Sequence, residues 1–197
     1  MALHFDRTEF DARRDRLVIE MADRKLDAML IFAQESMYWL TGYDTFGFCF
    51  FQCLVVKADG SMILMTRSAD LRQARHTSTL DNIVVWTDRD GANPAADLRN
   101  LLNDLDLLGC RIAIEYDTHG LTAKNGRLLD EEMKTFATTE DASSIIPRLR
   151  LYKSEAEYKA GEYDNRLRVQ HGVRLTRLDA AQVCALEPNL APLYHAG

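Results

Sequence analysis

Phe48–Thr66 has the sequence FCFFQCLVVKADGSMILMT, and this stretch determines what kind of sheet the chain can form. Phe48–Val56 is rich in aromatic and β-branched residues, which is typical of a β-strand. Asp59 and Gly60 follow it, and an Asp-Gly pair is a strong signal for a hairpin turn. Ser61–Thr66 then predicts the returning strand. The hairpin makes the sheet partly antiparallel, which argues against a purely parallel, doubly wound fold.

Helices and strands alternate on both sides of this hairpin. Asp6 is a predicted helix cap with Glu9 three residues later, as in a capping box, and Phe5 and Phe10 can form a hydrophobic staple. The other expected elements are strand Ala28–Phe32, a short helix Glu35–Leu40 ended by Gly42, helix Ser68–Arg75, strand Ile83–Trp86, a helix capped by Asn93 and ended by Gly109, strand Ile112–Glu115, helix Leu121–Glu132, strand Met133–Thr138 and a short helix through Ile146 capped by Asp141 or Ser143. This order predicts a three-layer α/β/α domain with a mixed, partly antiparallel sheet.

Composition and charge exclude several classes of protein. The chain has 197 residues, 47% of them hydrophobic and 27% charged, which predicts one globular domain and a short appendage. A net charge of -6 argues against a nucleic-acid partner, because phosphate binding requires clustered Lys and Arg. The sequence contains no run long enough to span a bilayer, and its polar start does not resemble a signal peptide. The four cysteines, Cys49, Cys53, Cys110 and Cys184, predict reduced core thiols of a cytoplasmic protein.

Three segments, taken in order, resemble the amino-terminal domain of the creatinase/prolidase/Xaa-Pro aminopeptidase family. Glu35–Asp44 is similar to that family's N-x-x-Y-L-T-G-Y turn. Ile114–Thr122 is similar to its G-V-E-x-D strand end. Ile145–Glu157 is similar to its LRxxKSxxE connector. Each motif is of modest specificity, but the three together, at domain-scale spacing, form a much stronger signal.

The resemblance implies a ribonuclease H-like domain at residues 1–152, followed by a connector and helical tail at 153–197. In that family the connector leads into a second domain, where two Asp, one His and two Glu bind two divalent metal ions that activate a water. The sequence after Glu157 departs from the family pattern, and no metal ligand can be carried over to this chain. We therefore expect two metal ions only in a domain outside this chain, and we expect the chain alone to be inactive.

The tail has a resemblance of its own. Leu178–Pro192 is similar to a short stretch of flavin-dependent D-amino-acid dehydrogenases. A flavin-binding unit requires a Gly-rich turn at a helix start, and the sequence contains no GxGxxG. An amphipathic helix capped by Asp179 and a fusion or misassembled reading frame are two interpretations of the tail. A tail that is part of a flavoenzyme is a third, weaker hypothesis.

Other catalytic sites receive little support from the sequence. The five histidines, His4, His76, His119, His171 and His195, do not pair at HxxxH or HxH spacing, so they predict surface or locally bonded side chains. The chain has no GxSxG motif, which argues against a serine nucleophile.

The aromatic residues around the expected first strand of the hairpin are the main candidate site. Strand alternation would place Phe48 and Phe50 on one face, and Cys49 and Phe51 on the other. In creatinase-like relatives this turn and strand reach across a dimer interface and help to line the neighbouring active site. The resemblance therefore makes five residues substrate-facing or interface candidates: Tyr43, Asp44, Phe48, Phe50 and Gln52. Core packing is the alternative for most of them. Creatinase has an Arg on this strand where Phe50 stands here, which favours a less charged substrate group.

Arg67 and Asp70 follow the second strand of the hairpin and can line the same cleft, although a solvated helix start would explain them equally well. The predicted function is a non-catalytic, substrate-shaping and dimerising domain of a metal-dependent C–N hydrolase, an Xaa-Pro peptidase or a creatinase-like enzyme. The alternative is a stand-alone module that binds an amino-acid-like ligand, a peptide or a protein partner. We expect a homodimer and no membrane partner.

Overall fold

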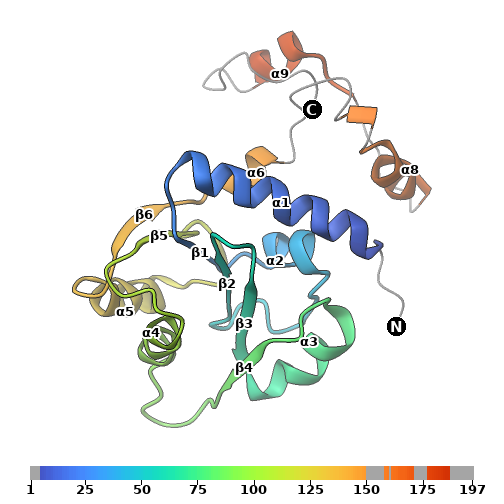
Figure 1. The fold of residues 1–197 in the computed structure, drawn as a ribbon. Coiled ribbons are helices and arrows are strands. Elements are labelled where there is room, and N and C mark those ends of the chain that lie inside the picture. The colour runs from blue at the N-terminus through green and yellow to red at the C-terminus, as the bar shows by residue number, and fades with distance from the viewer. Residues whose placement is uncertain (1–4, 150–157, 160, 171–176, 187–197) are drawn as a thin grey trace. The chain divides into compact units, whose positions relative to one another are not determined.

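The structure is a computed structural model that describes residues 5–149, 158–159, 161–170 and 177–186. It divides into two compact units, Met1–Ile145 and Ile146–Gly197. The first unit contains the β-sheet (Figure 1). Within the described ranges, none of the helices combines the length and the apolar character needed to cross a membrane.

The helices and strands follow the alternation expected from the sequence. The helices of the first unit are α1 Arg7–Asp23, α2 Gln34–Thr41, the 3-10 turn η1 Ser68–Asp70, α3 Leu71–Thr77, α4 Pro94–Asp104 and α5 Ala123–Met133, with α6 Ile145–Leu149 at the boundary between the units. The strands are β1 Ala28–Ile31, β2 Cys53–Lys57, β3 Met62–Arg67, β4 Ile83–Trp86, β5 Arg111–Ile114 and β6 Thr138–Asp141. The second unit contains α8 Glu162–Gln170 and α9 Ala180–Leu186.

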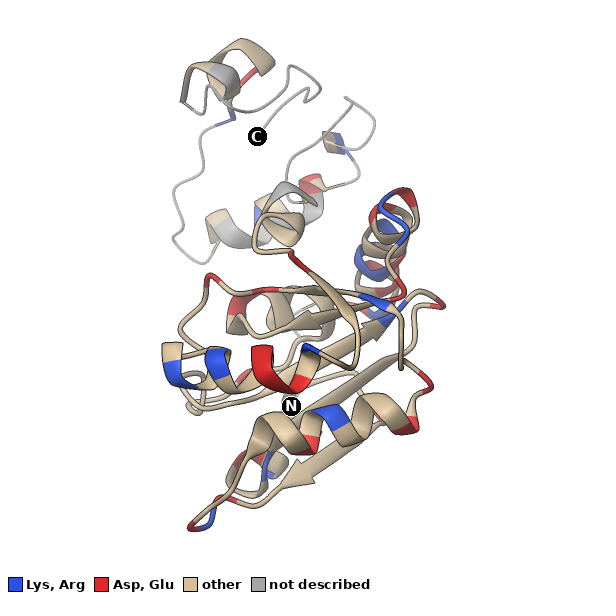
Figure 2. Cartoon of the chain, turned by 90° about the vertical axis from the view of Figure 1, so that its left-hand side faces the viewer, with Lys and Arg blue, Asp and Glu red and all other residues tan. Residues whose placement is uncertain are grey.

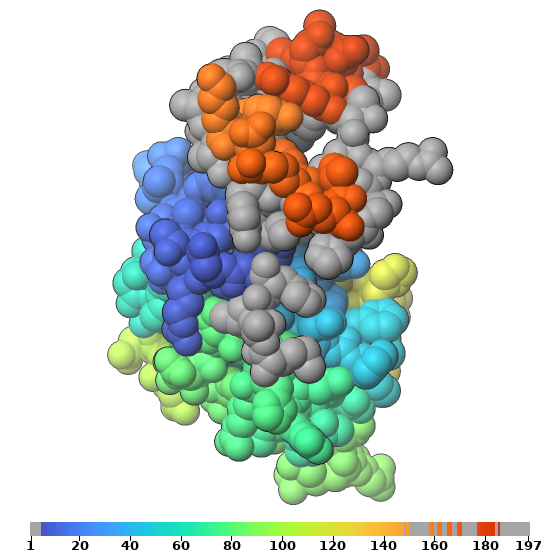
Figure 3. Space-filling model, turned by 90° about the vertical axis from the view of Figure 1, so that its right-hand side faces the viewer, coloured from blue at the N-terminus to red at the C-terminus, as the bar shows by residue number. Residues whose placement is uncertain are grey.

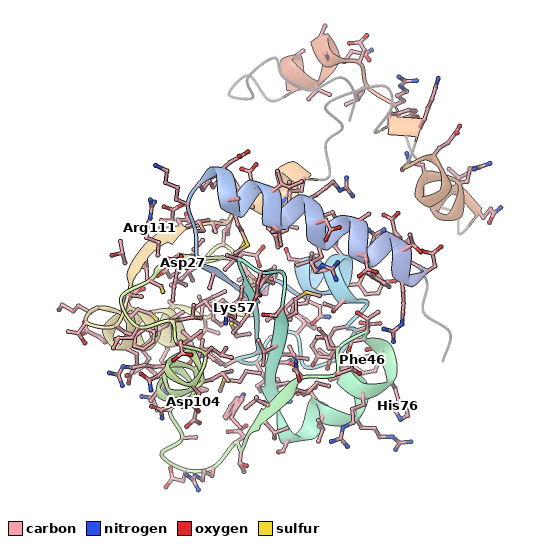
Figure 4. All side chains as sticks on the ribbon, in the orientation of Figure 1. Asp27, Phe46, Lys57, His76, Asp104 and Arg111 are labelled. Carbon is pink, nitrogen blue, oxygen red and sulfur yellow. The ribbon has the colours of Figure 1, made fainter. Side chains whose placement is uncertain are left out.

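The six strands form one mixed sheet in the order β4-β3-β2-β1-β5-β6. β2 pairs antiparallel with both β1 and β3, because the Asp59-Gly60 turn folds β3 back onto β2. The pairs β3–β4, β1–β5 and β5–β6 are parallel. At the start of the β1–β5 pair, the Arg111 backbone N–H donates to the Asp27 carboxylate at 2.8 Å (Figure 4). The expected mixed α/β sheet is thus confirmed.

The first helix begins as its sequence predicts. The Asp6 carboxylate accepts a hydrogen bond from the Glu9 backbone N–H at 2.8 Å, and the Phe5 and Phe10 rings meet edge to face at 5.9 Å. The Glu9 carboxylate instead pairs with Arg13, whose buried guanidinium also donates to the Trp39 carbonyl near the end of α2. Arg13 therefore ties α1 to α2 through buried polar contacts.

Helices cover both faces of the sheet: α1 and α2 pack on one face, and α4 and α5 on the other (Figure 1). The core facing α4 and α5 takes alternate residues of the strands, including Leu30, Val55 and Ile112, and packs them against Leu98 and Leu129. Charged residues lie mainly on helices and loops, while the strands are largely uncharged (Figure 2). The central strands β1 and β2 are buried on both faces, so they are continuously apolar.

Two predicted strands are wrong in their bounds. β2 starts at Cys53, and Phe46–Phe50 forms turns, because hydrogen bonds to the Gly47 carbonyl close this segment on itself. Phe48 and Phe50 are both exposed, but Cys49 between them is exposed as well, while Phe51 is buried. Cys49 and Phe51 therefore do not share a face, and the expected strand alternation does not hold here. At the other end of the sheet, Phe136 is buried by the turn after α5, and the strand starts later, at Thr138.

The cysteines also differ from the expectation. Cys53 is buried and Cys110 is partly buried, but Cys49 is exposed on the turn, so it is not a core thiol. All three are free, and burial raises the pKa of the Cys53 thiol. The side chain of Cys184 lies outside the described residues.

In the second unit, α9 has the cap that the sequence predicts. The Asp179 carboxylate accepts from the Gln182 backbone N–H at 2.9 Å, and the Gln182 side chain accepts from the Asp179 N–H at 2.9 Å. This reciprocal pair is a capping box.

Candidate functional site

The segment from the end of α2 to the start of β2 contains most of the candidate residues. Gly42 ends α2 in the left-handed conformation, with φ of 77°, and its N–H donates to the Tyr38 carbonyl. The Thr41 hydroxyl then accepts from the Tyr43 N–H at 3.1 Å. This turn directs the Tyr43 ring into the interior, where it is fully buried.

Tyr43 belongs to a buried polar network with Gln52 and Thr66. The Tyr43 and Thr66 hydroxyls both donate to the Gln52 side-chain oxygen, Thr66 at 2.5 Å. The Gln52 amide N–H donates in turn to the Gly47 carbonyl at 2.7 Å. Burial raises the pKa of Tyr43 to about 12, although the hydrogen bond with Thr66 opposes this shift. The buried side chains of Tyr43 and Gln52 thus support the following turn from the interior of the domain.

A second network fixes the other side of the same turn. The Asp70 carboxylate, 4% exposed, accepts from the Thr45 hydroxyl at 2.6 Å and from Arg67 Nε at 3.0 Å. The Gly47 backbone lies directly against this carboxylate, and a Cβ at position 47 would come within 2.3 Å of it. Only glycine fits at this close approach.

The turn held by these two networks exposes aromatic side chains. We call Phe46–Phe50 the phenylalanine turn. Phe46, labelled in Figure 4, is 90% exposed. Phe48 is 49% and Phe50 43% exposed. Its shape is maintained by the Phe50 N–H, which donates to the Gly47 carbonyl, and by the Gly47 N–H, which donates to the Thr45 hydroxyl. A rigid loop with exposed apolar side chains is typical of an interaction surface.

Arg67 lies beside this turn at the end of β3. Its guanidinium carbon is 3.4 Å from the centre of the Phe50 ring. Asp70 holds the Nε side, while Asp88 approaches the other side at 3.7 Å. Arg67 and Phe50 therefore form a stacked pair of a cation and an aromatic ring at the surface.

Asp44 is exposed and lies at the start of the same loop. Its backbone N–H donates to the Thr77 hydroxyl at 2.9 Å, which links the loop to α3. The structure thus brings together all six candidates, Tyr43, Asp44, Phe48, Phe50, Gln52 and Arg67, in or beside one loop. It places Tyr43 and Gln52 in the interior and the other four at or near its surface.

Glu115 is a buried group whose role the sequence did not reveal. Its carboxylate accepts from the N–H groups of Phe32 and Ala33 at 3.2 and 2.8 Å, and from the Ser36 hydroxyl at 2.7 Å. Ala33 offers no side-chain cap of its own. Glu115, at the end of β5, therefore caps α2 from a neighbouring strand. The sequence signals for this residue were its match to the glutamate of the G-V-E-x-D strand end and its position directly after an apolar strand.

The described residues contain no group of three or more His, Cys, Asp or Glu side chains that could hold a metal ion. His76 and His119 lie within this part of the chain, whereas His4, His171 and His195 lie outside it. The carboxylates of Asp70 and Glu115 are already bonded to protein donors. The donor set that a dimetal centre requires is therefore not assembled within residues 5–149, 158–159, 161–170 and 177–186.

The chain was compared with known proteins. It is 29% identical to ectoine hydrolase of Halomonas elongata over 164 residues, which cover 80% of this chain and 41% of that protein. It is 25% identical to an uncharacterized hydrolase/peptidase of Sinorhizobium fredii over 162 residues, 79% of this chain and 41% of that protein. The chain thus spans about two fifths of the length of these curated relatives.

Solved structures show the same fold. The N-terminal domain of the cytoplasmic peptidase PepQ from Mycobacterium tuberculosis H37Rv superposes with a TM-score of 0.56 at 23% identity, covering 71% of this chain and 98% of that one. A dipeptidase from Pyrococcus horikoshii OT3 gives 0.57 at 24% identity, covering 88% and 48%. The family model "Creatinase/Prolidase N-terminal domain" matches residues 13–152. Because that match extends over most of the chain, the protein belongs to the creatinase/prolidase family through this N-terminal domain.

Proposed function

We propose that this domain is a non-catalytic part of a metal-dependent hydrolase that acts on a C–N bond, an Xaa-Pro peptidase or a creatinase-like enzyme. It shapes the substrate cleft and forms a homodimer. The observation that carries the proposal is the phenylalanine turn, whose exposed rings are held by two buried polar networks. A loop that is already held in one conformation loses less conformational entropy on binding than an unstructured loop does.

The relatives support the hydrolase class. Ectoine hydrolase and the PepQ peptidase are hydrolases by name, and peptidases cleave C–N bonds. As part of this proposal, the two divalent ions of such an enzyme bind to a domain outside this chain; the described residues contain no group of three or more His, Cys, Asp or Glu that could hold a metal ion. The free thiols, including the exposed Cys49, favour a reducing compartment and agree with a cytoplasmic location.

The non-catalytic role is tested by assaying the 197-residue chain with Mn²⁺ or Co²⁺ on Xaa-Pro dipeptides and on ectoine. We expect no metal-dependent turnover. Turnover that appears with the metal and is abolished by a chelator would refute the non-catalytic role.

The phenylalanine turn is tested by replacing two of its exposed rings with serine, Phe46→Ser and Phe48→Ser together. We expect the double variant to shift light scattering toward monomer at concentrations where the parent chain is dimeric. Leu108→Ser is the matched control, since Leu108 is exposed and far from the turn in sequence. A parent chain that stays monomeric at high concentration would refute the proposed dimer.

A stand-alone binding module remains the second candidate, and the Arg67–Phe50 stack favours it. Asp70 holds the Nε of this guanidinium and Asp88 lies 3.7 Å from Nη1, which leaves Nη2 to bind a ligand carboxylate. The proposed ligand is a small amino acid or dipeptide. We expect the melting temperature to rise with such ligands and not to rise in Arg67→Gln. Equal melting temperatures with and without a panel of amino acids and dipeptides would exclude this function.

A further inference from the structure

The two edges of the sheet are protected very differently. β6, at one edge, ends in Glu140 and Asp141, and charged residues discourage edge-to-edge pairing. β4, at the other edge, has the sequence IVVW, with Val84 38% and Val85 39% exposed. No strand of the described ranges pairs with its outer side. Helix α3, drawn in green and preceding β4 in the chain, lies at the molecular surface (Figure 3). An exposed apolar edge of this kind is suited to pairing with another strand.

The register of β4 on β3 shows which backbone groups are available. The Leu64 N–H donates to the Asn82 carbonyl at 3.0 Å, and Leu64 lies opposite Ile83. In a parallel ladder, alternate residues direct their N–H and C=O to the same neighbour. Val84, like Asn82, therefore faces β3, and Val85, like Ile83, faces outward.

We propose that a second copy of this chain pairs with β4 in the antiparallel direction, on a two-fold axis through Val85. Closed two-fold pairing brings the same surface of both copies together. Val85 then lies opposite the partner's Val85, and Ile83 opposite the partner's Thr87. Both positions have outward backbone groups, as hydrogen-bonded antiparallel pairs require.

Charge favours this register over its neighbours. With Val85 on the axis, Asp81 lies opposite the partner's Arg89, and by symmetry this contact occurs twice. Asp81 and Arg89 are both exposed, and neither has an ion-pair partner among the described residues. A shift by one residue is excluded, because it would set outward backbone groups against inward ones. A shift by two residues, the next one allowed, would place Asp81 opposite the partner's Thr87 or Gly91 and would lose both charge contacts.

Side-chain packing favours the same register. Val84 lies opposite the partner's Trp86, and a β-branched residue opposite an aromatic one is a favourable cross-strand pair. The exposed Val84 would thereby be covered, and the two six-stranded sheets would become continuous. This inference rests on the homodimer of the proposed function, and it adds a second contact between the two copies, at β4, to the contact proposed for the phenylalanine turn.

Cysteine crosslinking tests the axis. In a Cys49→Ser, Cys110→Ser background, Val85→Cys places two thiols directly opposite each other at a Cα separation of about 5.5 Å, within the range of a disulfide. Val84→Cys is the matched control, because its partner thiol lies two residues away along the strand. We expect Val85→Cys, and not Val84→Cys, to give a covalent dimer on mild oxidation. Equal crosslinking, or none, overturns the proposed register.

A charge swap tests the pairing without new thiols. Asp81→Arg and Arg89→Glu each create two like-charge contacts, and we expect each to weaken the dimer about tenfold by sedimentation analysis. The double variant Asp81→Arg/Arg89→Glu restores opposite charges and should recover the parent affinity. Exposed Asp106, changed to Arg, is the control for a change in net charge.

The outcomes separate this inference from the proposed function. A dimer that is insensitive to the charge swap and lost in Phe46→Ser/Phe48→Ser refutes β4 pairing but retains the homodimer. A chain that is monomeric at high concentration refutes both contacts, while the hydrolysis assay still tests the non-catalytic role separately.

Discussion

Two carboxylates of different burial approach Arg67. The side chain of Asp70 is 6% exposed and is therefore largely shielded from water. The side chain of Asp88 is 61% exposed, and its carboxylate lies 3.7 Å from Arg67 Nη1. Replacing Asp70 with alanine removes the Nε partner of a mostly buried guanidinium. It also removes one of the two acceptors of the Thr45 hydroxyl, which keeps only the Gln73 side-chain oxygen at 2.6 Å. We expect Asp70→Ala to lower the free energy of unfolding by about 2–3 kcal/mol.

Asp88→Ala should change the same free energy by less than about 0.5 kcal/mol, because an exposed ion pair contributes little. Urea unfolding of both variants measures the difference. Similar losses in the two variants would show that the Asp70 network does not stabilise the loop.

The buried hydroxyl of Tyr43 predicts a pH dependence. Its pKa is raised to about 12 in the folded state, while an unfolded tyrosine ionises near about 10. Stability from this group is therefore complete below pH about 10, and it falls as pH rises toward about 12. The expected loss is about 1.4 kcal/mol per pH unit over that range.

Tyr43→Phe removes this contribution, so its unfolding free energy should decline less steeply than that of the parent between these pH values. Burial also raises the pKa of Tyr116, which adds to the slope of both proteins equally. Denaturant titrations at a series of alkaline pH values give both slopes. Parallel slopes would contradict the prediction.

A glycine-to-alanine substitution should change the free energy of unfolding in opposite directions in the phenylalanine turn and in α5. In the phenylalanine turn, Gly47→Ala forces a Cβ against the Asp70 carboxylate, which Arg67 and Thr45 hold in place. We expect a loss of about 2 kcal/mol or more in unfolding free energy. In α5, Gly126 has its nearest neighbour 3.9 Å from the added Cβ, so Gly126→Ala should gain about 0.5–1 kcal/mol. Thermal unfolding measures both, and a neutral Gly47→Ala would refute the close packing.

Most elements could be predicted from local signals. The Asp59-Gly60 turn, the Asp6 and Asn93 caps and the Gly42 helix end are all present in the structure. These signals act within a few residues, so the sequence alone reveals them. Phe48–Phe50 has the composition of a strand, but it lies in a turn, which Gln52 closes through the Gly47 carbonyl. Asp70, distant in sequence, holds the start of the same loop by accepting from the Thr45 hydroxyl.

The sequence predicted which segment contains the candidate site, but not how the side chains of that segment are buried and bonded. The resemblance pointed to the loop that contains Tyr43 and Gln52, yet it gave no sign that both side chains are buried. Burial depends on which strand faces which helix. The bonds of Gln52 to Thr66, and of Asp70 to Thr45, join separate elements. A local pattern does not contain this information.

The molecule as a whole divides at Ile145, and the sheet with its helices α1 to α5 precedes that point. The hydrophobic core cluster facing α4 and α5 extends only from Ala28 to Phe136. We therefore expect a chain of residues 1–149 to fold alone and to unfold in one cooperative transition. Circular dichroism and urea unfolding measure this.

The matched control ends at Ala137 and lacks β6, which would leave the apolar β5 as a bare sheet edge. It should aggregate or lose cooperativity. If residues 1–149 also fail to fold, the first unit depends on the second.

The cap that Glu115 provides for α2 has a consequence for the order of folding. Its bonds to Phe32 and Ala33 close loops of 83 and 82 residues, and a helix of eight residues is too short to persist unaided. Such long closures are slow, because chain entropy opposes them until many contacts form together. The start of α2 should gain hydrogen-exchange protection only when β5 docks on β1, well after the β2–β3 hairpin. On the ribosome, α2 and the aromatic loop after it would therefore become ordered only once residue 115 has emerged.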